Sequence, residues 1–281
     1  MNKDIFCKQH RLIHGDALEE MDRLISEGVK VDAIICDPTF GITQRKNDII
    51  LNFEEMWKRL LLLRRNINTP IILFSNGMNT AELMISNKKM WKYNWVWDKI
   101  LPSGMLNANR MPLTDYDDIQ VFNEEDNSNI DPYLSVFYSK QSVYNKQMKD
   151  GNPEHGRGNI NGKEFKGEEN NYGDYKICTD NKGRTKKNPT RIIRLSKDHP
   201  SIVIHSQQKP VSLGEYLVKT YTNEGDTVLD FMMGSGFIIK ACDNSKRNGI
   251  GIDSGYCKKK KFKEYYNKPW NQIVNYIILN K

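Results

Sequence analysis

Apolar and polar residues alternate with two different periods along residues 1 to 124. Apolar residues spaced three and four apart predict amphipathic helices in three segments, 17–28, 53–66 and 79–89. Short runs rich in β-branched and aromatic residues predict strands at 31–37, 70–75, 93–99 and 117–123. Helices that alternate with strands are typical of βαβ units, so the pattern predicts an α/β fold with a mainly parallel sheet.

The same alternation resumes near residue 190. Apolar runs predict strands at 190–196, 201–206, 226–232 and 249–253, and helices at 212–225 and from 234 onward. Ser212 is followed three residues later by Glu215, a spacing that predicts a capping box at the first of these helices. The lysine-rich tail beyond 255 predicts a basic helix, followed by an element of undetermined type. Its lysine run is interpreted as a solvated helix face, with a binding patch as the alternative.

The segment from 125 to 190 interrupts this pattern. Asn, Gly, Lys and Glu dominate it, apolar periodicity is lost, and aromatic residues are interleaved with Lys and Arg. One interpretation is a disordered insertion between two halves of a single core. The other is a loop-rich module that grips a polyanion and is ordered mainly when bound.

Composition narrows the class of protein. A length of 281 residues suits one large α/β domain with an insertion, and a net charge of +7 permits an anionic partner such as nucleic acid. The five cysteines form no C-x-x-C pair, which argues against disulfides or a zinc site and for a reducing compartment. No apolar run approaches the length of about 20 residues that spans a membrane. We therefore expect a cytoplasmic protein without a metal-ligand cluster and without a membrane partner.

A glycine turn follows the strand predicted at 226–232. Gly234 and Gly236 allow a tight turn and a close approach of a ligand, and Asp253 ends the next strand 17 residues after Gly236. An acid at about this distance (~20 residues) holds ribose hydroxyls in nucleotide-binding units. The third glycine of the dinucleotide fingerprint and the G-K-[ST] of a P-loop are absent, which favours an adenosine ligand without phosphates, such as S-adenosylmethionine (SAM). The alternative is a tight βα turn that binds nothing.

The stretch DPTF, residues 37–40, follows another predicted strand. Open parallel sheets place their sites at the carboxyl ends of the strands. Pro38 stiffens the turn, so the Asp37 carboxylate and the Pro38 carbonyl can both accept hydrogen bonds from one external amino group. Phe40 offers a flat face on which a base can stack. The alternative is a polar strand cap beside a core aromatic.

These stretches, in this order, resemble the SAM-dependent DNA amino-methyltransferases of the β arrangement. DPTFG resembles the catalytic [D/N/S]-P-P-[Y/F/W] motif, and DFMMGSG resembles the F-x-G-x-G loop of the SAM site. The stretches HGDALEEM, LNANRMPLTDYDDIQVF and HSQQKPVSL also resemble family segments, so the resemblance covers almost the whole chain. It implies a permuted class I SAM-dependent methyltransferase fold, a Rossmann-like, mostly parallel mixed sheet with helices on both faces. The implied division is a catalytic half at 1–124, a target-recognition region at 125–190 and a SAM-binding half at 191–281.

The resemblance also implies roles for individual residues. The catalytic residues are Asp37, Pro38 and Phe40, and the cofactor-binding residues are Asp16 near the adenine, Lys209 and Pro210 around the methionine end, Asp230, Phe231, Gly234 and Gly236 in the loop, and Asp253 on the ribose. The implied activity is methyl transfer from SAM to the N6 amino group of a flipped-out adenine in double-stranded DNA. The alternatives are a cytosine-N4 methyltransferase and a catalytically inactive DNA-binding protein of the same fold.

Three positions depart from the family pattern. Thr39 replaces the second proline of the catalytic motif, Phe237 puts a bulky residue after G-S-G, and GIDSGYC is shorter than the usual segment around the ribose acid. Together these departures favour a slow or inactive enzyme. Whether the protein forms a homodimer, and whether a restriction endonuclease accompanies it in a restriction-modification system, are both left open.

Overall fold

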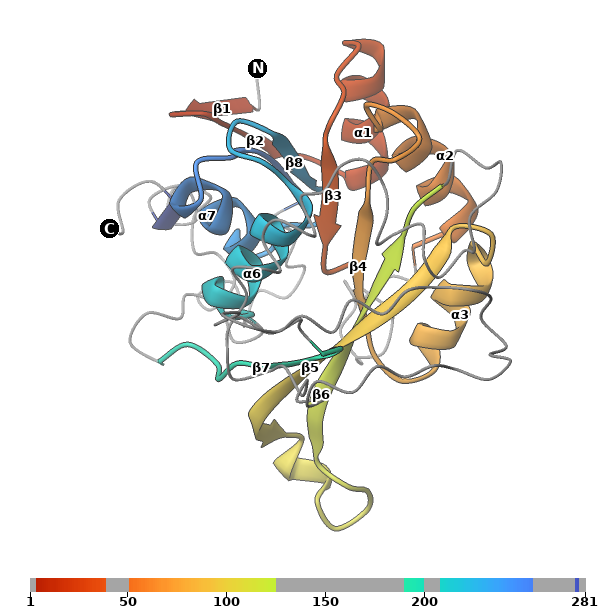
Figure 1. Cartoon of the computed structure of the whole chain (residues 1–281), viewed down its shortest axis with the longest axis vertical. Coiled ribbons are helices and arrows are strands. Elements are labelled where there is room, and N and C mark those ends of the chain that lie inside the picture. Colours follow the sequence, from red (N-terminus) through yellow and green to blue (C-terminus); the bar gives the residue numbers. More distant parts are fainter. Residues whose placement is uncertain (1–3, 39–50, 125–189, 200–207, 255–275, 278–281) are drawn as a thin grey trace, which may run out of the picture.

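The computed structural model describes residues 4–38, 51–124, 190–199, 208–254 and 276–277. Within these ranges the strands form a single sheet (Figure 1). The strands are β1 (Asp4–Cys7), β2 (His10–His14), β3 (Ala33–Cys36), β4 (Ile71–Ser75), β5 (Trp91–Ser103), β6 (Thr114–Phe122), β7 (Ile192–Arg194), β8 (Thr227–Asp230) and β9 (Asn248–Asp253). The helices are α1 (Ala17–Ser26), α2 (Phe53–Leu63), α3 (Met78–Ser86), the 3-10 turn η1 (Met105–Asn107), α6 (Val211–Tyr221) and α7 (Phe237–Asn244).

The strand order is β1-β2-β9-β8-β3-β4-β6-β5-β7. Five consecutive strands, from β2 to β4 in this order, run parallel to one another, and β7 is parallel to β5. The pairs β1–β2, β4–β6 and β5–β6 are antiparallel. The sheet is therefore mixed and mostly parallel, as the alternating pattern predicted.

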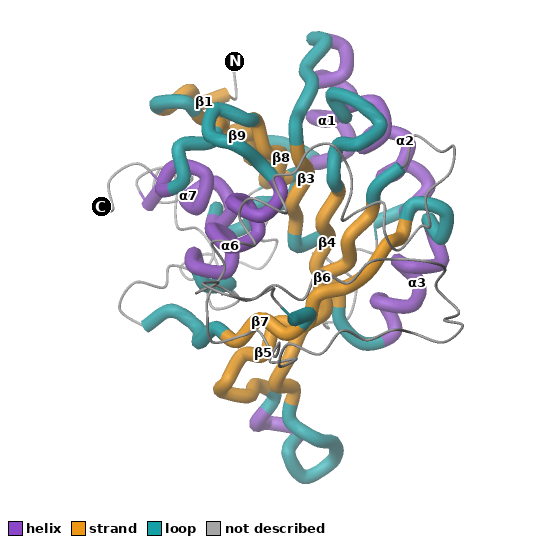
Figure 2. The backbone as a smooth tube through the Cα atoms, viewed as in Figure 1, coloured by secondary structure: helices purple, strands orange, loops and turns teal. Residues whose placement is uncertain are grey.

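The two faces of the sheet bury different helices (Figure 2). Successive side chains of a strand point to opposite faces, and in β3 the residues Ile34 and Cys36 join a core that contains α1, α2 and α3. Ala33 and Ile35 join the core on the other face, which contains α6 and α7. Because both faces are covered, the central strand is apolar at all four positions rather than alternating.

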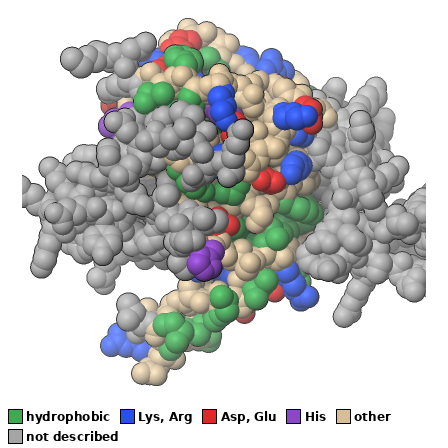
Figure 3. Space-filling view, turned by 90° about the vertical axis from the view of Figure 1, so that its left-hand side faces the viewer, with side chains coloured by type: hydrophobic (Ala, Val, Ile, Leu, Met, Phe, Trp, Pro, Cys, Tyr) green, Lys and Arg blue, Asp and Glu red, His purple; other side chains and the backbone are tan. Residues whose placement is uncertain are grey.

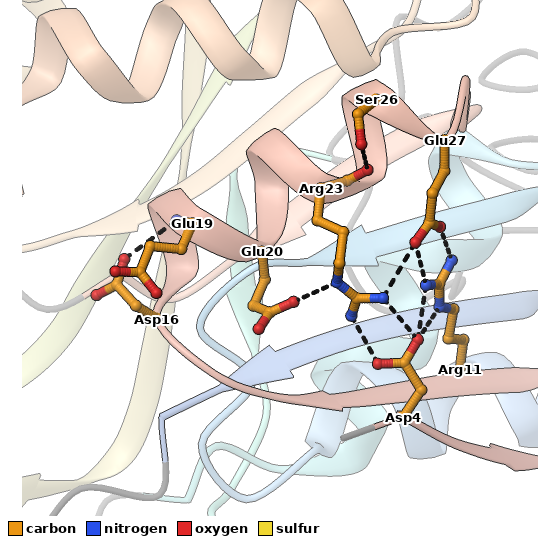
Figure 4. Close-up of polar contacts among 8 residues, drawn as sticks. All are labelled: Asp4, Arg11, Asp16, Glu19, Glu20, Arg23, Ser26 and Glu27. Carbon is orange, nitrogen blue, oxygen red and sulfur yellow. Dashed lines mark hydrogen bonds and ion pairs between the residues drawn. The ribbon is translucent and has the colours of Figure 1, made fainter. Parts of the chain in front are cut away.

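An ionic cluster fastens the edge pair β1–β2 to α1 (Figure 4). The Asp4 carboxylate pairs with Arg11 at 2.6 Å and with Arg23 at 2.6 Å, and Arg23 also pairs with Glu20 at 2.7 Å. Glu27 contacts both arginines from the end of the helix. The sequence pattern predicted neither of these short strands, because their few apolar residues show no clear period.

Strands β5 and β6 extend beyond their neighbours as a long arm, which projects from the body in Figures 1 and 3. Ile100 has a φ of +64° within a register shift of this pair, and its N–H is held by the Asp98 carboxylate at 2.9 Å. Large apolar side chains are exposed along the arm, namely Ile100, Leu101, Met105 and Met111. The predicted strand at 93–99 therefore continues several residues further than its pattern indicated.

The predicted capping box at Ser212 is wrong. Helix α6 begins one residue earlier, with Pro210 as its N-cap and no side-chain cap at that position. The Asp198 carboxylate, from a separate segment, accepts the Val211 N–H at 3.2 Å, while Glu215 pairs with Lys219. A long-range contact thus replaces the local one.

Several sequence predictions fall outside the described residues. They are the strand at 201–206, the basic tail helix and nearly all of the target-recognition region. Among the helices that the structure describes, none combines the length and apolar character needed to cross a bilayer. The described ranges likewise contain no group of His, Cys, Asp and Glu that could hold a metal ion.

Candidate active site

The two chemically distinctive stretches of the sequence meet at one edge of the sheet. Strands β3 and β8 are parallel neighbours, with Ala33 opposite Val228 and Ile34 opposite Leu229. Asp37 and Pro38 directly follow β3, and the glycine loop directly follows β8. Because parallel strands end at the same edge, segments from opposite ends of the chain lie side by side there.

The glycine loop has the backbone that its sequence predicted. Gly234 and Gly236 have φ values of +51° and +78°, a region that side-chain-bearing residues rarely adopt. The Gly234 N–H donates to Asp253 Oδ2 at 2.9 Å, so the acid that ends β9 is tied to the loop. A Cβ added at Gly234 would meet no atom within 4 Å, which leaves open space for a ligand beside the loop. Helix α7 starts directly after Gly236, so its first N–H groups, which lack partners within the helix, lie at the end of the loop.

Asp230 lies at the base of the loop and is fully buried. Its Oδ1 accepts the Met232 N–H at 3.3 Å, and its Oδ2 has no hydrogen-bond partner among the described residues. Burial raises the pKa of this carboxyl to about 8 and also raises the pKa of the adjacent Cys36 thiol. An orphaned buried polar atom at the base of a glycine turn fits a polar cofactor such as SAM.

Two aromatic residues of this region point into the core. The Phe231 ring is fully buried among the residues that pack on α1 and α2, so only its backbone is available to the loop. The Phe237 ring packs edge-on against Phe74, with centroids 5.9 Å apart. The bulky residue after G-S-G is thus accommodated in the core and does not fill the loop.

Asp16 reaches the same edge from the neighbouring strand. The Gly15 N–H donates to the Asp253 carbonyl at 3.1 Å, which places the start of α1 beside the end of β9. The Asp16 carboxylate accepts the N–H groups of Leu18 at 2.9 Å and Glu19 at 3.2 Å, so it is the N-cap of α1 (Figure 4). Such a cap stabilises a helix by about 1 kcal/mol. The predicted adenine contact of Asp16 stays a prediction.

Asp37 is held by a residue from the segment predicted to surround the methionine end of SAM. The Lys209 ammonium donates to Asp37 Oδ2 and lies 4.8 Å from the centre of the Phe74 ring. Pro38 and Pro210 are buried beside these two charged residues in the chain. Phe40 and Thr39 lie outside the described residues.

Sequence reasoning missed Asp117, Lys99 and Asn76 at this edge. Lys99 pairs with Asp117 at 2.8 Å, and the Asn76 amide donates to the same carboxylate at 2.6 Å. Asp117 lies 4.0 Å from Lys209 and is thus connected to Asp37. The only signal in the sequence was the family-like stretch LNANRMPLTDYDDIQVF, which contains Asp117 but does not indicate its partners.

A family model described as DNA methylase, covering the N6 and N4 enzymes, matches residues 31–264. The chain belongs to this N6/N4 DNA methylase family. The match spans the catalytic stretch, the strands from β3 to β9 and the glycine loop, and it begins after β1 and β2. It confirms the family that the sequence motifs indicated, and with it the prediction of SAM as cofactor.

Individual relatives agree with this membership. The chain is 47% identical over 69 residues to the type II methyltransferase M.HpaI of Haemophilus parainfluenzae, a match over 24% of this chain and 22% of the relative. The chain thus spans only about a fifth of the length of that relative. Its fold is similar to that of the M1.HpyAVI–SAM complex, with a TM-score of 0.54, 20% identity and coverage of 92% and 99% of the two chains.

A second solved structure with a similar fold is that of an enzyme whose target base is cytosine. The fold of the chain is similar to that of the cytosine-N4-specific PvuII DNA methyltransferase, with a TM-score of 0.52 and 12% identity. The match covers 96% of this chain and 92% of the other. Together these similarities confirm the class I SAM-dependent methyltransferase fold.

Proposed function

We propose that this protein transfers a methyl group from SAM to the N6 amino group of an adenine in double-stranded DNA. The observation that carries the proposal is the juxtaposition of Asp37 and Pro38, after β3, with the glycine loop after the neighbouring strand β8. This arrangement brings a pair of hydrogen-bond acceptors next to the predicted cofactor loop. Adenine is proposed because an aspartate comes first and an aromatic residue last in the catalytic stretch.

The residues act by orienting a weak nucleophile. The lone pair of the adenine amino nitrogen is delocalised into the ring, and hydrogen bonds from its N–H groups to Asp37 and to the Pro38 carbonyl favour the pyramidal form. Orientation of this kind contributes ~7–11 kcal/mol in well-arranged reactions. Asp37 also offsets the positive charge that develops on nitrogen. The target base leaves the duplex at a cost of a few kcal/mol, and stacking on Phe40 would offset part of it.

The cofactor site is proposed at the glycine loop. SAM, when bound, supplies the electrophilic methyl group. Gly234 and Gly236 would line it with backbone, Asp253 would accept from its ribose, and the buried Asp230 carboxyl would provide a further polar partner. The supporting observations are the open space at Gly234 and the orphaned Oδ2 of Asp230.

The test is methyl transfer from tritium-labelled SAM to DNA, followed by digestion to nucleosides. The wild type is expected to incorporate label that co-migrates with N6-methyladenine. Asp37→Ala should lower incorporation at least 100-fold, since misplaced reacting groups cost about that much. Asp22→Ala is the matched control, because Asp22 is an exposed carboxylate on α1 whose described ion pair is with Arg59.

Two results would contradict the proposal in different ways. Label in N4-methylcytosine would keep the methyltransferase and change its target base. DNA binding without incorporation by the intact protein would favour the inactive DNA-binding alternative.

A further inference from the structure

Four side chains of alternating charge form a chain of contacts at the edge of the sheet that carries Asp37. Lys209 donates to Asp37 Oδ2, Asp117 Oδ2 lies 4.0 Å from the Lys209 ammonium, and Asp117 Oδ1 pairs with Lys99 at 2.8 Å. The Asn76 amide donates to Asp117 Oδ1 at 2.6 Å. We call the four charged residues, Asp37, Lys209, Asp117 and Lys99, the ion chain. It joins the end of β3 to the start of α6 and to the paired strands β5 and β6.

The ion chain is largely enclosed. Exposed fractions of the side chains are 7% for Lys99, 12% for Lys209 and 15% for Asp117, and they rise to 29% at Asp37. Moving one charge out of a buried set leaves its neighbours without a counter-charge, which costs free energy. Each member is therefore held in its position by the others. Lys99, the member furthest from Asp37, is thus the most enclosed, and the end of the ion chain at Asp37 is the most open to a substrate.

Lys209 is held from three sides. Asp37 and Asp117 flank its ammonium, and the Phe74 ring lies beneath it with 4.8 Å from the nitrogen to the ring centre. A cation over an aromatic face is attracted by the ring quadrupole, most strongly where water is excluded. A lysine side chain, which is otherwise very mobile, therefore has one favoured position here.

We propose that Lys209 and Asp117 are positioning residues for the catalytic carboxylate, an inference that rests on the proposed function. Asp117, fixed by Lys99 and Asn76, holds the Lys209 ammonium. Lys209 engages Oδ2 of Asp37, and within the described residues no hydrogen bond reaches Oδ1. One oxygen of Asp37 is thereby fixed, and the other is kept for the amino group of the target base.

Asp118 provides a built-in comparison. It is adjacent to Asp117 on β6, but successive residues of a strand point to opposite faces. Its carboxylate accepts from Asn94 at 3.1 Å and from Thr80 at 3.2 Å, and neither partner belongs to the ion chain. If substitution lowers kcat only by weakening β6, replacing either aspartate should lower it. If kcat falls because Asp37 is no longer positioned, only replacement of Asp117 should lower it.

The experiment compares Asp117→Asn, Asp118→Asn, Lys209→Met and Lys209→Arg in the full chain. Each protein is assayed for kcat and KM in DNA methylation, for the Kd of SAM by calorimetry and for its melting temperature. Asp117→Asn and Lys209→Met are expected to lower kcat about 100-fold, the cost of a misplaced reacting group. Their Kd for SAM should stay within about threefold of the wild type, and Lys209→Arg, which keeps the charge, should recover at least tenfold of the lost kcat.

The outcomes separate the inference from its alternatives. Equal losses of kcat in Asp117→Asn and Asp118→Asn, or a kcat unchanged in Asp117→Asn despite a lower melting temperature, would reduce the ion chain to a stabilising cluster. A large loss of SAM affinity in Lys209→Met with normal kcat at saturating SAM would make Lys209 a cofactor ligand and overturn the inference. A wild type that binds SAM and transfers no methyl group would overturn the proposed function itself.

Discussion

Asp230 is a carboxyl group enclosed by the core where β8 becomes the glycine loop. It is buried together with the Cys36 thiol, and its Oδ2 is unpaired among the described residues. An ionised carboxylate in such a place loses its hydration without gaining a counter-ion, so burial raises its pKa to about 8. The native protein therefore holds a proton on Asp230 at neutral pH, whereas the unfolded chain releases it.

This proton makes stability depend on pH in a defined direction. Since the folded pKa of Asp230 is raised, its contribution is fully present below the unfolded value of 3.8 and is lost as pH rises through about 8. We expect the free energy of unfolding to fall across this window, with a slope of up to about 1.4 kcal/mol per pH unit from this group. Asp230→Asn, which is neutral at every pH, should lack that component of the slope.

The measurement is urea unfolding of both proteins at several pH values between 5 and 9. The variant should gain stability relative to the wild type as pH rises, and the gain should level off above about pH 8. Parallel stability curves for the two proteins would show that Asp230 is ionised throughout the native range.

At the scale of elements, the glycine loop depends on how closely β9 approaches it. The Met233 N–H donates to the Ile252 carbonyl at 2.9 Å, which lays the loop on the strand. A Cβ at Gly251 would overlap the Met233 sulfur and would lie 3.0 Å from Ile239 Cγ1. Packing, and not backbone conformation, therefore favours glycine at position 251.

Gly251→Ala is expected to displace the loop and weaken SAM binding. Overpacking of a tight site costs about 1–3 kcal/mol, and about 1.4 kcal/mol corresponds to a tenfold rise in Kd. Calorimetric titration with SAM measures this directly. Gly249→Ala is the matched control on the same strand, because its Cβ would meet His10 and Ile239 but no loop residue. Equal effects of both variants on SAM affinity would contradict the proposed coupling between β9 and the loop.

The elements themselves were largely predictable, and their partners were not. Periodicity identified the helices at α1, α2 and α3 and the strands at β3, β4, β8 and β9, because each has enough apolar residues on one face or in one run. The cap of α6 was predicted within the segment, but the structure supplies it from Asp198. The role of Asp117 was invisible for the same reason, since its partners lie 18 and 92 positions away in Lys99 and Lys209. Local patterns carry no information about such long-range contacts.

At the scale of the whole molecule, the sheet interleaves the two ends of the chain. The C-terminal pair β8–β9 lies between β2 and β3, so it separates strands that are close in sequence. In the first 124 residues alone, both β2 and β3 would have an unsatisfied edge at the centre of the sheet. Neither half of the chain therefore has a complete core of its own.

This arrangement predicts how the chain responds to cutting. A chain divided between residues 150 and 151 should give two fragments that each lack a cooperative unfolding transition. Co-expressed, they should co-purify and share one transition, because β2–β9 and β3–β8 pairing crosses the cut. Circular dichroism during heating distinguishes these states. A cooperative transition in the isolated N-terminal fragment would contradict the expectation.

The same interleaving has a consequence for synthesis on the ribosome. The place in the sheet between β2 and β3 is occupied by β8 and β9. It is complete only when β9 has emerged, more than two hundred residues after β3. At about 5–20 residues per second, the nascent chain waits roughly ten to forty seconds with two central strand edges unpaired. During that interval β2 and β3 are templates for pairing with other chains. The step that completes the active site is thus also the step that ends the period in which the chain is most prone to aggregate.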